Sequence, residues 1–329
     1  MQRSFNEGRM AWPSIAMSVP ESHWKIVVPR LLAGKVVLFL GAGVNLSVRK
    51  DKEPWAPFET LPSGAELAQY LADSCGYEER DRDDLLRVSQ YMTLVEGSAP
   101  LYESLHKLMD VDYAPTPLHE FVARLPNLMK ESPDNGGRRK PLIITTNYDD
   151  VLERALRAAG EEFDTVYYAA DGAQRGKFWH LRPGTREPEL IETPNEYQDV
   201  STEKRTVLLK IHGNVDRGDA TRDSYVVTED HYIDYLTRTD LSSLVPAMLA
   251  KVMRTSHFLF MGYGLRDWNL RVILHRLWGK QSLTYQSWAI QKEPKDLDKK
   301  FWAARAVEVI DEGLAGYVEA LVERCGPKK

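Results

Sequence analysis

Four short groups of glycine and polar residues each follow directly after a run of apolar residues. They are Gly41-Ala42-Gly43, Thr145-Thr146-Asn147-Tyr148-Asp149, His212-Gly213 and Gly262-Tyr263-Gly264. Glycines let a backbone come close to a pyrophosphate, and free N–H groups at the start of a helix favour its negative charge. An imidazole can accept a proton near neutral pH, because an unperturbed histidine has a pKa of about 6.5. Together the groups indicate a dinucleotide site with a base beside it.

Each group also has a simpler structural interpretation. A Gly-Ala-Gly sequence often makes only a tight turn, Asn147 and Asp149 could cap the following helix, and His212 could be a buried structural histidine. The usual dinucleotide fingerprint needs a third glycine and an acidic residue about 20 residues later. The sequence Gly-Ala-Gly-Val-Asn-Leu-Ser at 41–47 fails this pattern, which weakens a dehydrogenase interpretation. The functional interpretation therefore depends on whether the four groups meet.

The apolar runs before the four groups predict buried strands of a parallel sheet. These runs cover 35–40, 141–146, 206–211 and 257–261. In an open parallel sheet, ligands bind outside the carboxyl ends of the strands, so we expect the groups to converge on one crevice. Apolar spacing further predicts helices at 24–32, 149–159, 267–278 and 313–324, and strands at 287–290 and 307–310. This alternation predicts the α/β class.

The rest of the chain suggests one domain with two interruptions. We expect an N-terminal arm at 1–22, a catalytic domain at 23–325 and a tail at 326–329. Helical spacing of apolar residues predicts a helical insertion over about 60–130. The stretch over about 170–204 is rich in Gly, Pro, Arg and Glu, and we expect an irregular loop there. Such a loop is either a lid or a plain surface excursion.

The composition limits the classes of function. The chain has 329 residues, with 43 Lys and Arg against 48 Asp and Glu, which leaves a formal net charge of −5. This balance argues against a protein that mainly binds nucleic-acid phosphates. No apolar run reaches the roughly 18–20 residues of a bilayer span, and no signal-peptide pattern is present, so we expect a cytoplasmic protein without membrane association. With only Cys75 and Cys325, we predict no disulfide framework and no metal site.

The polar groups carry a family resemblance when they are taken in order. Four motifs occur: Gly41-Ala-Gly43-Val-Asn45, Thr146-Asn147-Tyr-Asp149, Lys210-Ile-His212-Gly213 and Gly262-Tyr-Gly264-Leu-Arg-Asp267-Trp-Asn269. This ordered set resembles the sirtuin-like domain family, and more closely its bacterial branch found in anti-phage defence systems. The resemblance extends over residues 30–290. Four motifs in the family's order are far more specific than any one of them.

The resemblance implies a Rossmann-like parallel sheet flanked by helices, with an inserted helical lobe, that binds NAD⁺ as a substrate. It also implies cleavage of the bond between nicotinamide and ribose. Carried over by motif, Asn147 orients a water and the nicotinamide ribose, Asp149 holds the carboxamide, and His212 contacts the ribose hydroxyls and assists as a base. The remaining positions expected to bind NAD⁺, chiefly its phosphates and adenosine ribose, are Gly41, Ala42, Gly43, Asn45, Thr146, Gly213, Gly262, Tyr263 and Gly264.

The sequence also departs from the family pattern. The familiar motif has serine or threonine where this chain has Asn45, and the arginine-bearing segment of protein deacylases is not recognisable in 47–58. The four zinc cysteines of the deacylases are missing, so no zinc ribbon is expected. The reaction that the resemblance implies is therefore NAD⁺ hydrolysis, with water in place of acetyl-lysine as the acceptor.

The leading hypothesis is an NAD⁺ hydrolase that releases nicotinamide and ADP-ribose as the effector of a bacterial anti-phage system. An uncontrolled activity of this kind would kill its host, so we expect control by a homo-oligomeric assembly or by a co-encoded partner. In relatives the partner is an ATPase, an Argonaute-like protein or a nucleotide-processing enzyme. Two alternatives remain open: an NAD-dependent protein deacylase or ADP-ribosyltransferase, and a non-catalytic module that senses NAD or another nucleotide.

Overall fold

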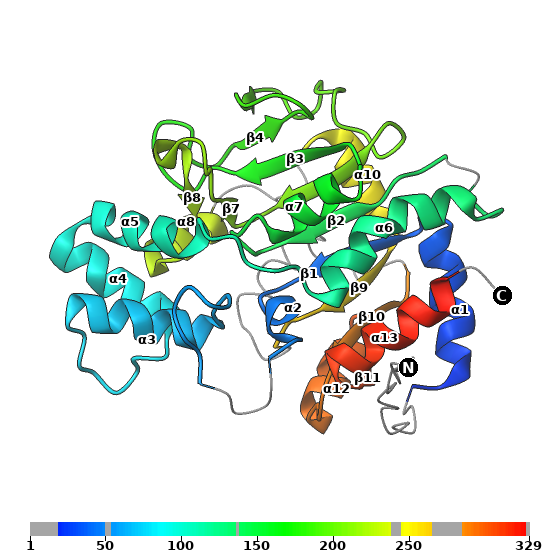
Figure 1. Cartoon of the computed structure of the whole chain (residues 1–329), viewed down its shortest axis with the longest axis horizontal. Helices are drawn as coiled ribbons and strands as arrows, with labels where there is room; N and C mark the ends of the chain where they lie inside the picture. The colour runs from blue at the N-terminus through cyan, green and yellow to red at the C-terminus, as the bar shows by residue number, and fades with distance from the viewer. Residues whose placement is uncertain (1–18, 50–53, 136–137, 238–244, 265–284, 327–329) are drawn as a thin grey trace, which may run out of the picture.

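The computed structural model describes residues 19–49, 54–135, 138–237, 245–264 and 285–326. These residues form one nine-stranded sheet with helices on both faces (Figure 1). Its strands are β1 (Val36–Leu40), β2 (Leu142–Thr145), β3 (Phe163–Tyr168), β4 (Phe178–Leu181), β5 (Glu189–Ile191), β6 (Thr206–Lys210), β9 (His257–Met261), β10 (Ser287–Gln291) and β11 (Val307–Asp311). They lie in the order β11-β10-β9-β1-β2-β6-β3-β4-β5, and all neighbours are parallel except β3–β4 and β4–β5.

The four strands that precede the polar groups are adjacent in the sheet. Leu40 at the end of β1 pairs with Met261 of β9 and with Thr145 of β2, and Thr145 pairs with Lys210 of β6. The last residues of all four strands therefore lie side by side at the carboxyl edge. This arrangement confirms the predicted parallel α/β sheet, whose central strands are buried on both faces as continuous apolar runs predict.

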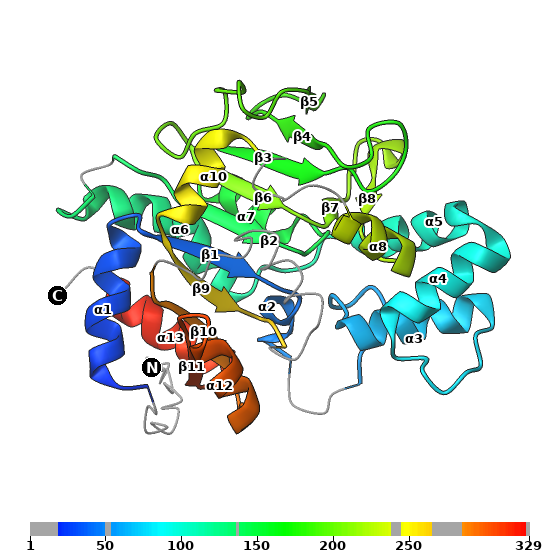
Figure 2. The same ribbon diagram turned by 180° about the vertical axis from the view of Figure 1, so that it is seen from behind.

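Helices cover the two faces of the sheet and are packed by alternate strand residues. One face carries α1 (Glu21–Leu32), α6 (Pro117–Glu131), α7 (Val151–Ala158) and α13 (Leu314–Cys325) (Figure 1). The other carries α10 (Ala247–Arg254) and α12 (Asp296–Ala303) (Figure 2). In β1, for example, Leu38 and Leu40 pack on the first face, and Val37 and Phe39 on the second. No helix in the described ranges combines the length and apolar character that crossing a bilayer requires.

Beyond the carboxyl edge lies a helical lobe made of α3 (Gly64–Cys75), α4 (Leu85–Glu96) and α5 (Ser98–Met109) (Figure 2). Ser63 and Glu66 start α3 with a reciprocal capping box, which satisfies two N–H groups at the helix start. The three helices share their own apolar cluster, whereas α6, from the same predicted insertion, packs on the sheet. A ribbon of β7 (Gly213–Asn214) and β8 (Ser224–Tyr225), joined through a 3₁₀ turn (Ala220–Arg222), and α8 (Glu229–Thr237) complete this end.

Some expectations differ from the structure or lie outside it. The segment 170–204 contains β4 and β5, which extend the sheet as antiparallel strands, and β3 was not predicted. These strands are short and lack a continuous apolar run, so cross-strand pairing with β3 decides their conformation. Residues 1–18 of the expected arm, the helix at 267–278, the last five residues of the fourth motif and most of the tail lie outside the described residues.

The end of β6 is tied to α7 by a buried ion pair. The Lys210 Nζ lies 2.7 Å from the Glu153 Oε1 and also donates to the carbonyl oxygens of Tyr148 and Asp149, at 3.1 and 2.6 Å. The Lys210 side chain is fully buried. A buried ammonium is tolerated only when it is paired and its donors are satisfied. These contacts meet that requirement and join β2, β6 and α7 at the carboxyl edge.

We expect Lys210→Met to lower the free energy of unfolding by about 3–5 kcal/mol, because it leaves the Glu153 carboxylate buried without its partner. The double variant Lys210→Met/Glu153→Leu should recover part of this loss, since it removes both buried charges. Urea unfolding followed by circular dichroism measures both changes. A double variant that is less stable than the single one would contradict the ion-pair explanation.

Candidate functional site

A cavity of about 640 Å³ opens between the carboxyl edge of the sheet and the helical lobe. The sheet side contributes residues that follow β1, β2, β6 and β9, together with residues between β8 and α8 and in α8. The lining residues from this side are Ala42, Asn45, Thr146, Asn147, Tyr148, Asp149, His212, Val226, Val227, Tyr232 and Tyr263. The lobe side contributes Leu61, Pro62, Ser63, Gly64, Ala65, Leu67, Asp83, Asp84, Leu85, Leu86 and Met109.

The cavity brings together most of the side chains predicted from the sequence. Its lining includes the two predicted catalytic residues, Asn147 and His212, and also Ala42, Asn45, Thr146, Asp149 and Tyr263. The predicted glycines do not line it; they are Gly41, Gly43, Gly213, Gly262 and Gly264. The geometry therefore separates the predicted residues into side chains at the cavity surface and glycines that shape the turns around it.

The glycines after β1 and β9 let two turns pack against each other. The Gly43 N–H donates to the Gly262 carbonyl at 2.9 Å, and the Gly41 N–H donates to the Met261 carbonyl at 3.0 Å. A Cβ on Gly41 would lie 2.7 Å from the Gly262 oxygen, and one on Gly262, whose φ is +76°, would lie 2.5 Å from the Val44 nitrogen. Only glycine fits such close backbone contact. The N–H groups of Gly41 and Gly43 are thus engaged within the protein, and their contact with phosphates stays a prediction.

The loop of residues 146–150 between β2 and α7, the β2–α7 loop, is held from several sides. The Thr145 hydroxyl donates to the Leu40 carbonyl at 2.9 Å and accepts from the Asn147 N–H at 3.0 Å. The Asn147 amide Nδ2 lies 3.4 Å from the Gly41 carbonyl. Lys210 binds the next two carbonyl oxygens, as described above. The loop therefore presents Asn147 from a fixed backbone, as a positioned catalytic side chain requires.

Asp149 both caps a helix and orients Asn45. One carboxylate oxygen accepts the Val151 N–H at 3.1 Å at the start of α7, and the other accepts the Asn45 Nδ2 at 3.1 Å. A carboxylate is only an acceptor, so Asn45 must turn its NH₂ group to Asp149 and its Oδ1 away. That Oδ1 is buried and has no hydrogen-bond partner among the described residues. Asp149 can therefore cap α7 and still belong to a binding site, as the two interpretations from the sequence require.

His212 lies two residues after the end of β6 and is only 5% exposed. Its Nδ1 lies 3.4 Å from the Tyr232 hydroxyl, and its Nε2 is buried without a partner in the described part of the chain. Burial lowers the pKa of His212 to about 3. The imidazole is thus neutral at pH 7 and is a weaker base than the unperturbed pKa suggests. Buried polar atoms are rarely left unpaired, so Nε2 and the Asn45 Oδ1 are candidates for hydrogen bonds to a ligand.

Charge in the cavity is negative on the described surface. The charged lining residues are Asp83, Asp84 and Asp149, and no lysine or arginine is among the lining residues that the structure describes. Asp84 also caps α4, accepting the Leu86 N–H at 3.0 Å. Such a surface favours a ligand group with positive charge. No cluster of three or more His, Cys, Asp or Glu in the described ranges is placed to hold a metal ion, and the metal-free assignment stays a prediction.

The lobe wall of the cavity and Tyr232 were not predicted from the sequence. Asp83 lies in the turn before α4 and Met109 ends α5, so both are distant in the chain from the strand ends, and neither stands in a motif. Lys210 belongs to a quoted motif but had no assigned role. A lysine at the end of an apolar strand, two residues before His212, is the sequence feature that could have indicated a buried ion pair at this edge of the sheet.

Comparison with known proteins agrees with this geometry. Residues 141–310 match the SIR2-like domain family. The chain is 23% identical over 286 residues to Defense-associated sirtuin 2 of Bacillus subtilis, an alignment that covers 84% of this chain and 23% of that protein. It is 24% identical over 262 residues to NAD(+) hydrolase ThsA of Acinetobacter baumannii (strain 532279), covering 78% of this chain and 43% of that protein.

The chain spans less than half the length of either relative. The family match nevertheless covers more than half of the 329 residues and contains the groups that follow β2, β6 and β9. The resemblance predicted from the ordered motifs is therefore confirmed, and the chain belongs to the SIR2-like domain family.

Proposed function

We propose that the protein hydrolyses NAD⁺ to nicotinamide and ADP-ribose in the cavity at the carboxyl edge. The observation that carries this proposal is the buried Nε2 of His212, without a partner among the described residues, in the same cavity as Asn147. Similarity to a protein named NAD(+) hydrolase ThsA supports the substrate, and similarity to Defense-associated sirtuin 2 supports a role in anti-phage defence.

The proposed chemistry suits the charge and polarity of the cavity. Nicotinamide in NAD⁺ carries a positive charge and leaves as a neutral molecule, so the ribose becomes oxocarbenium-like in the transition state. The carboxylate of Asp149 can stabilise this charge, and a placed water can complete the reaction. The oxygen of that water forms a bond to the ribose carbon as the bond to nicotinamide breaks, and one water proton is released.

Asn147 and His212 have separate tasks in this scheme. The Asn147 amide orients the water and the ribose. Since burial keeps His212 neutral at pH 7, its imidazole accepts a hydrogen bond from the water or from a ribose hydroxyl. It takes up a proton only as the water bonds to the ribose and becomes acidic. In this scheme, the positioning of water and ribose therefore contributes more to the rate than the basicity of the free His212 imidazole does.

We further propose that the enzyme acts in the cytoplasm as an NAD⁺-depleting effector and is controlled by a homo-oligomeric assembly or by a co-encoded sensor protein. Depletion of NAD⁺ harms the cell that contains the enzyme, so activity must be restrained until infection. An ATPase, an Argonaute-like protein or a nucleotide-processing enzyme would each fit the sensor role.

We expect His212→Ala and Asn147→Ala each to reduce nicotinamide release from NAD⁺ by about 100-fold or more, since each removes a positioned polar group. Chromatography of the products measures release, for the protein alone and together with proteins encoded beside it. His257→Ala is the matched control, because His257 begins β9 at the opposite edge of the sheet.

The outcomes separate the hypotheses. Release that both variants retain would refute the assigned site. Wild-type protein that binds NAD⁺ but releases nothing in any assembly would refute the hydrolase and favour a sensing module. Release that requires an acylated or acceptor peptide would favour a deacylase or ADP-ribosyltransferase.

The low pKa of His212 predicts an unusual pH dependence. Protonation inactivates a histidine that must accept a hydrogen bond, and for His212 this occurs only as the pH falls toward about 3. We therefore expect kcat/KM for nicotinamide release to show no decline due to His212 between pH 8 and pH 5.5. Initial rates at low substrate over this range test the point, because kcat/KM reports groups of the free enzyme. A wild-type decline centred near pH 6.5 would contradict it.

A further inference from the structure

The cavity has two walls that belong to different parts of the protein, so its shape depends on what joins them. The sheet wall carries Asn147 and His212, and the lobe wall carries Asp83 and Met109. An apolar cluster joins the lobe to the sheet side through Val151, Val215, Tyr225 and Val227. A second connection is polar and lies at residues 110–113, the lobe linker between α5 and α6.

Arg217, in the connection between β7 and β8, binds the lobe linker directly. Its guanidinium donates to the Asp112 carboxylate at 2.7 Å and to the Val111 carbonyl at 2.5 Å, and lies 3.4 Å from the Asp110 carboxylate. The same guanidinium lies 3.0 Å from the carboxylate of Asp150 in the β2–α7 loop. One side chain therefore connects the lobe linker to the loop that carries Asn147 and Asp149.

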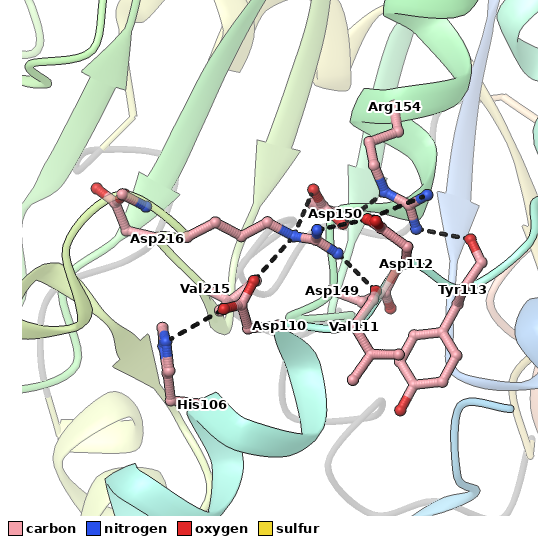
Figure 3. A network of polar contacts seen from close by, with 12 residues as sticks. His106, Asp110, Val111, Asp112, Tyr113, Asp149, Asp150, Arg154, Val215 and Asp216 are labelled. Atoms are coloured by element: carbon pink, nitrogen blue, oxygen red, sulfur yellow. Dashed lines mark hydrogen bonds and ion pairs between the residues drawn. The ribbon is translucent and has the colours of Figure 1, made fainter. Parts of the chain in front are cut away.

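Asp150 is the shared partner of two arginines. Its other carboxylate oxygen accepts from Arg154 Nε at 3.0 Å, and Arg154 also donates to the Tyr113 carbonyl at 2.6 Å. Figure 3 shows Asp110, Val111, Asp112 and Tyr113 beside Asp150 and Arg154. Asp150 is only 9% exposed, so its charge depends on these partners. Arg154 and Arg217 therefore bind two backbone carbonyls of the lobe linker, and Arg217 also pairs with its carboxylates.

The segment that carries Arg217 is itself fixed. The preceding Asp216 N–H donates to the Asp223 carboxylate at 2.7 Å, and the other oxygen of Asp223 lies 2.7 Å from His106 Nδ1 on α5. Arg217 therefore approaches the linker from a backbone that is already attached to the lobe. A planar guanidinium can serve several acceptors at fixed angles, which a lysine ammonium cannot do.

We propose that Arg217 is a positioning residue for NAD⁺ cleavage: it couples the lobe linker to the β2–α7 loop and so holds the two walls of the cavity at their working separation. This inference rests on the proposed hydrolase function. The Arg217 side chain is 27% exposed, so its ion pairs contribute modestly to global stability. Its main effect is on the geometry of the cavity, where small displacements of reacting groups lower rates strongly.

The test compares Arg217→Met, Arg217→Lys and the matched control Arg222→Met. Arg222 follows in the same connection but pairs with Asp219 and Glu187 instead of the lobe. We expect Arg217→Met to lower kcat/KM for nicotinamide release by about 10–100-fold, changing KM as well as kcat, because the separation of the two walls affects both substrate binding and the position of the reacting groups. Arg217→Lys should restore part of this loss, and Arg222→Met should match the wild type.

Hydrogen exchange measured by mass spectrometry supplies a readout that does not depend on turnover. Arg217→Met should speed exchange in peptides that contain residues 110–113 and 146–150, without a comparable change in the central strands. Asp112→Asn, on a largely exposed side chain, is a second variant that should shift kinetics and exchange in the same direction by less.

Two results would overturn the inference, and a third would overturn the proposed function. Arg217→Met with wild-type kinetics and exchange, or Arg222→Met with equal effects, would refute the positioning role while the wild type still releases nicotinamide. A wild type that releases none in any assembly would refute the hydrolase and, with it, this role of Arg217.

Discussion

The buried ammonium of Lys210 is the contact on which the site depends most. Its burial requires close acceptors, and the protein supplies the Glu153 carboxylate and the carbonyl oxygens of Tyr148 and Asp149. These carbonyls belong to the β2–α7 loop, and Lys210 is two residues before His212. One charge therefore fixes the loop with Asn147 relative to the strand that precedes His212. The parallel register of β2 and β6 brings these groups together in the first place.

Burial also changes the chemistry of the groups that it positions. His212 and Asn45 are both more than nine-tenths buried, and each keeps one polar atom without a partner in the described structure. Unpaired buried atoms reduce stability, so their presence in one cavity is consistent with a site built for a ligand. The same burial makes His212 a neutral acceptor at pH 7. In the proposed hydrolysis, a neutral His212 therefore serves to position water and ribose more than to act as a strong general base.

The helical lobe supplies the second wall of the cavity, which the sheet alone does not provide. It supplies half of the lining residues of the cavity from a segment that is distant in the chain from the strand ends, and its connection to the sheet side is partly ionic. Asp150 illustrates the coupling, because it adjoins Asp149 in sequence yet bonds to arginines that hold the lobe linker. The lobe and the β2–α7 loop are therefore connected through the ion pairs of one carboxylate.

The amino-acid sequence was enough to predict the central strands and the polar residues that follow them. Runs such as Val36–Leu40 are apolar throughout because both faces of the strand are covered, and the polar groups follow at once because each run stops at the sheet edge. The short strand Phe178–Leu181 could not be predicted, since its pairing partner decides its conformation. The low pKa of His212, the hydrogen bonds of the glycine N–H groups, the lobe wall of the cavity and the ion pairs of Arg217 arise from the folded arrangement. Each depends on contacts between residues far apart in the chain, which local residue patterns do not encode.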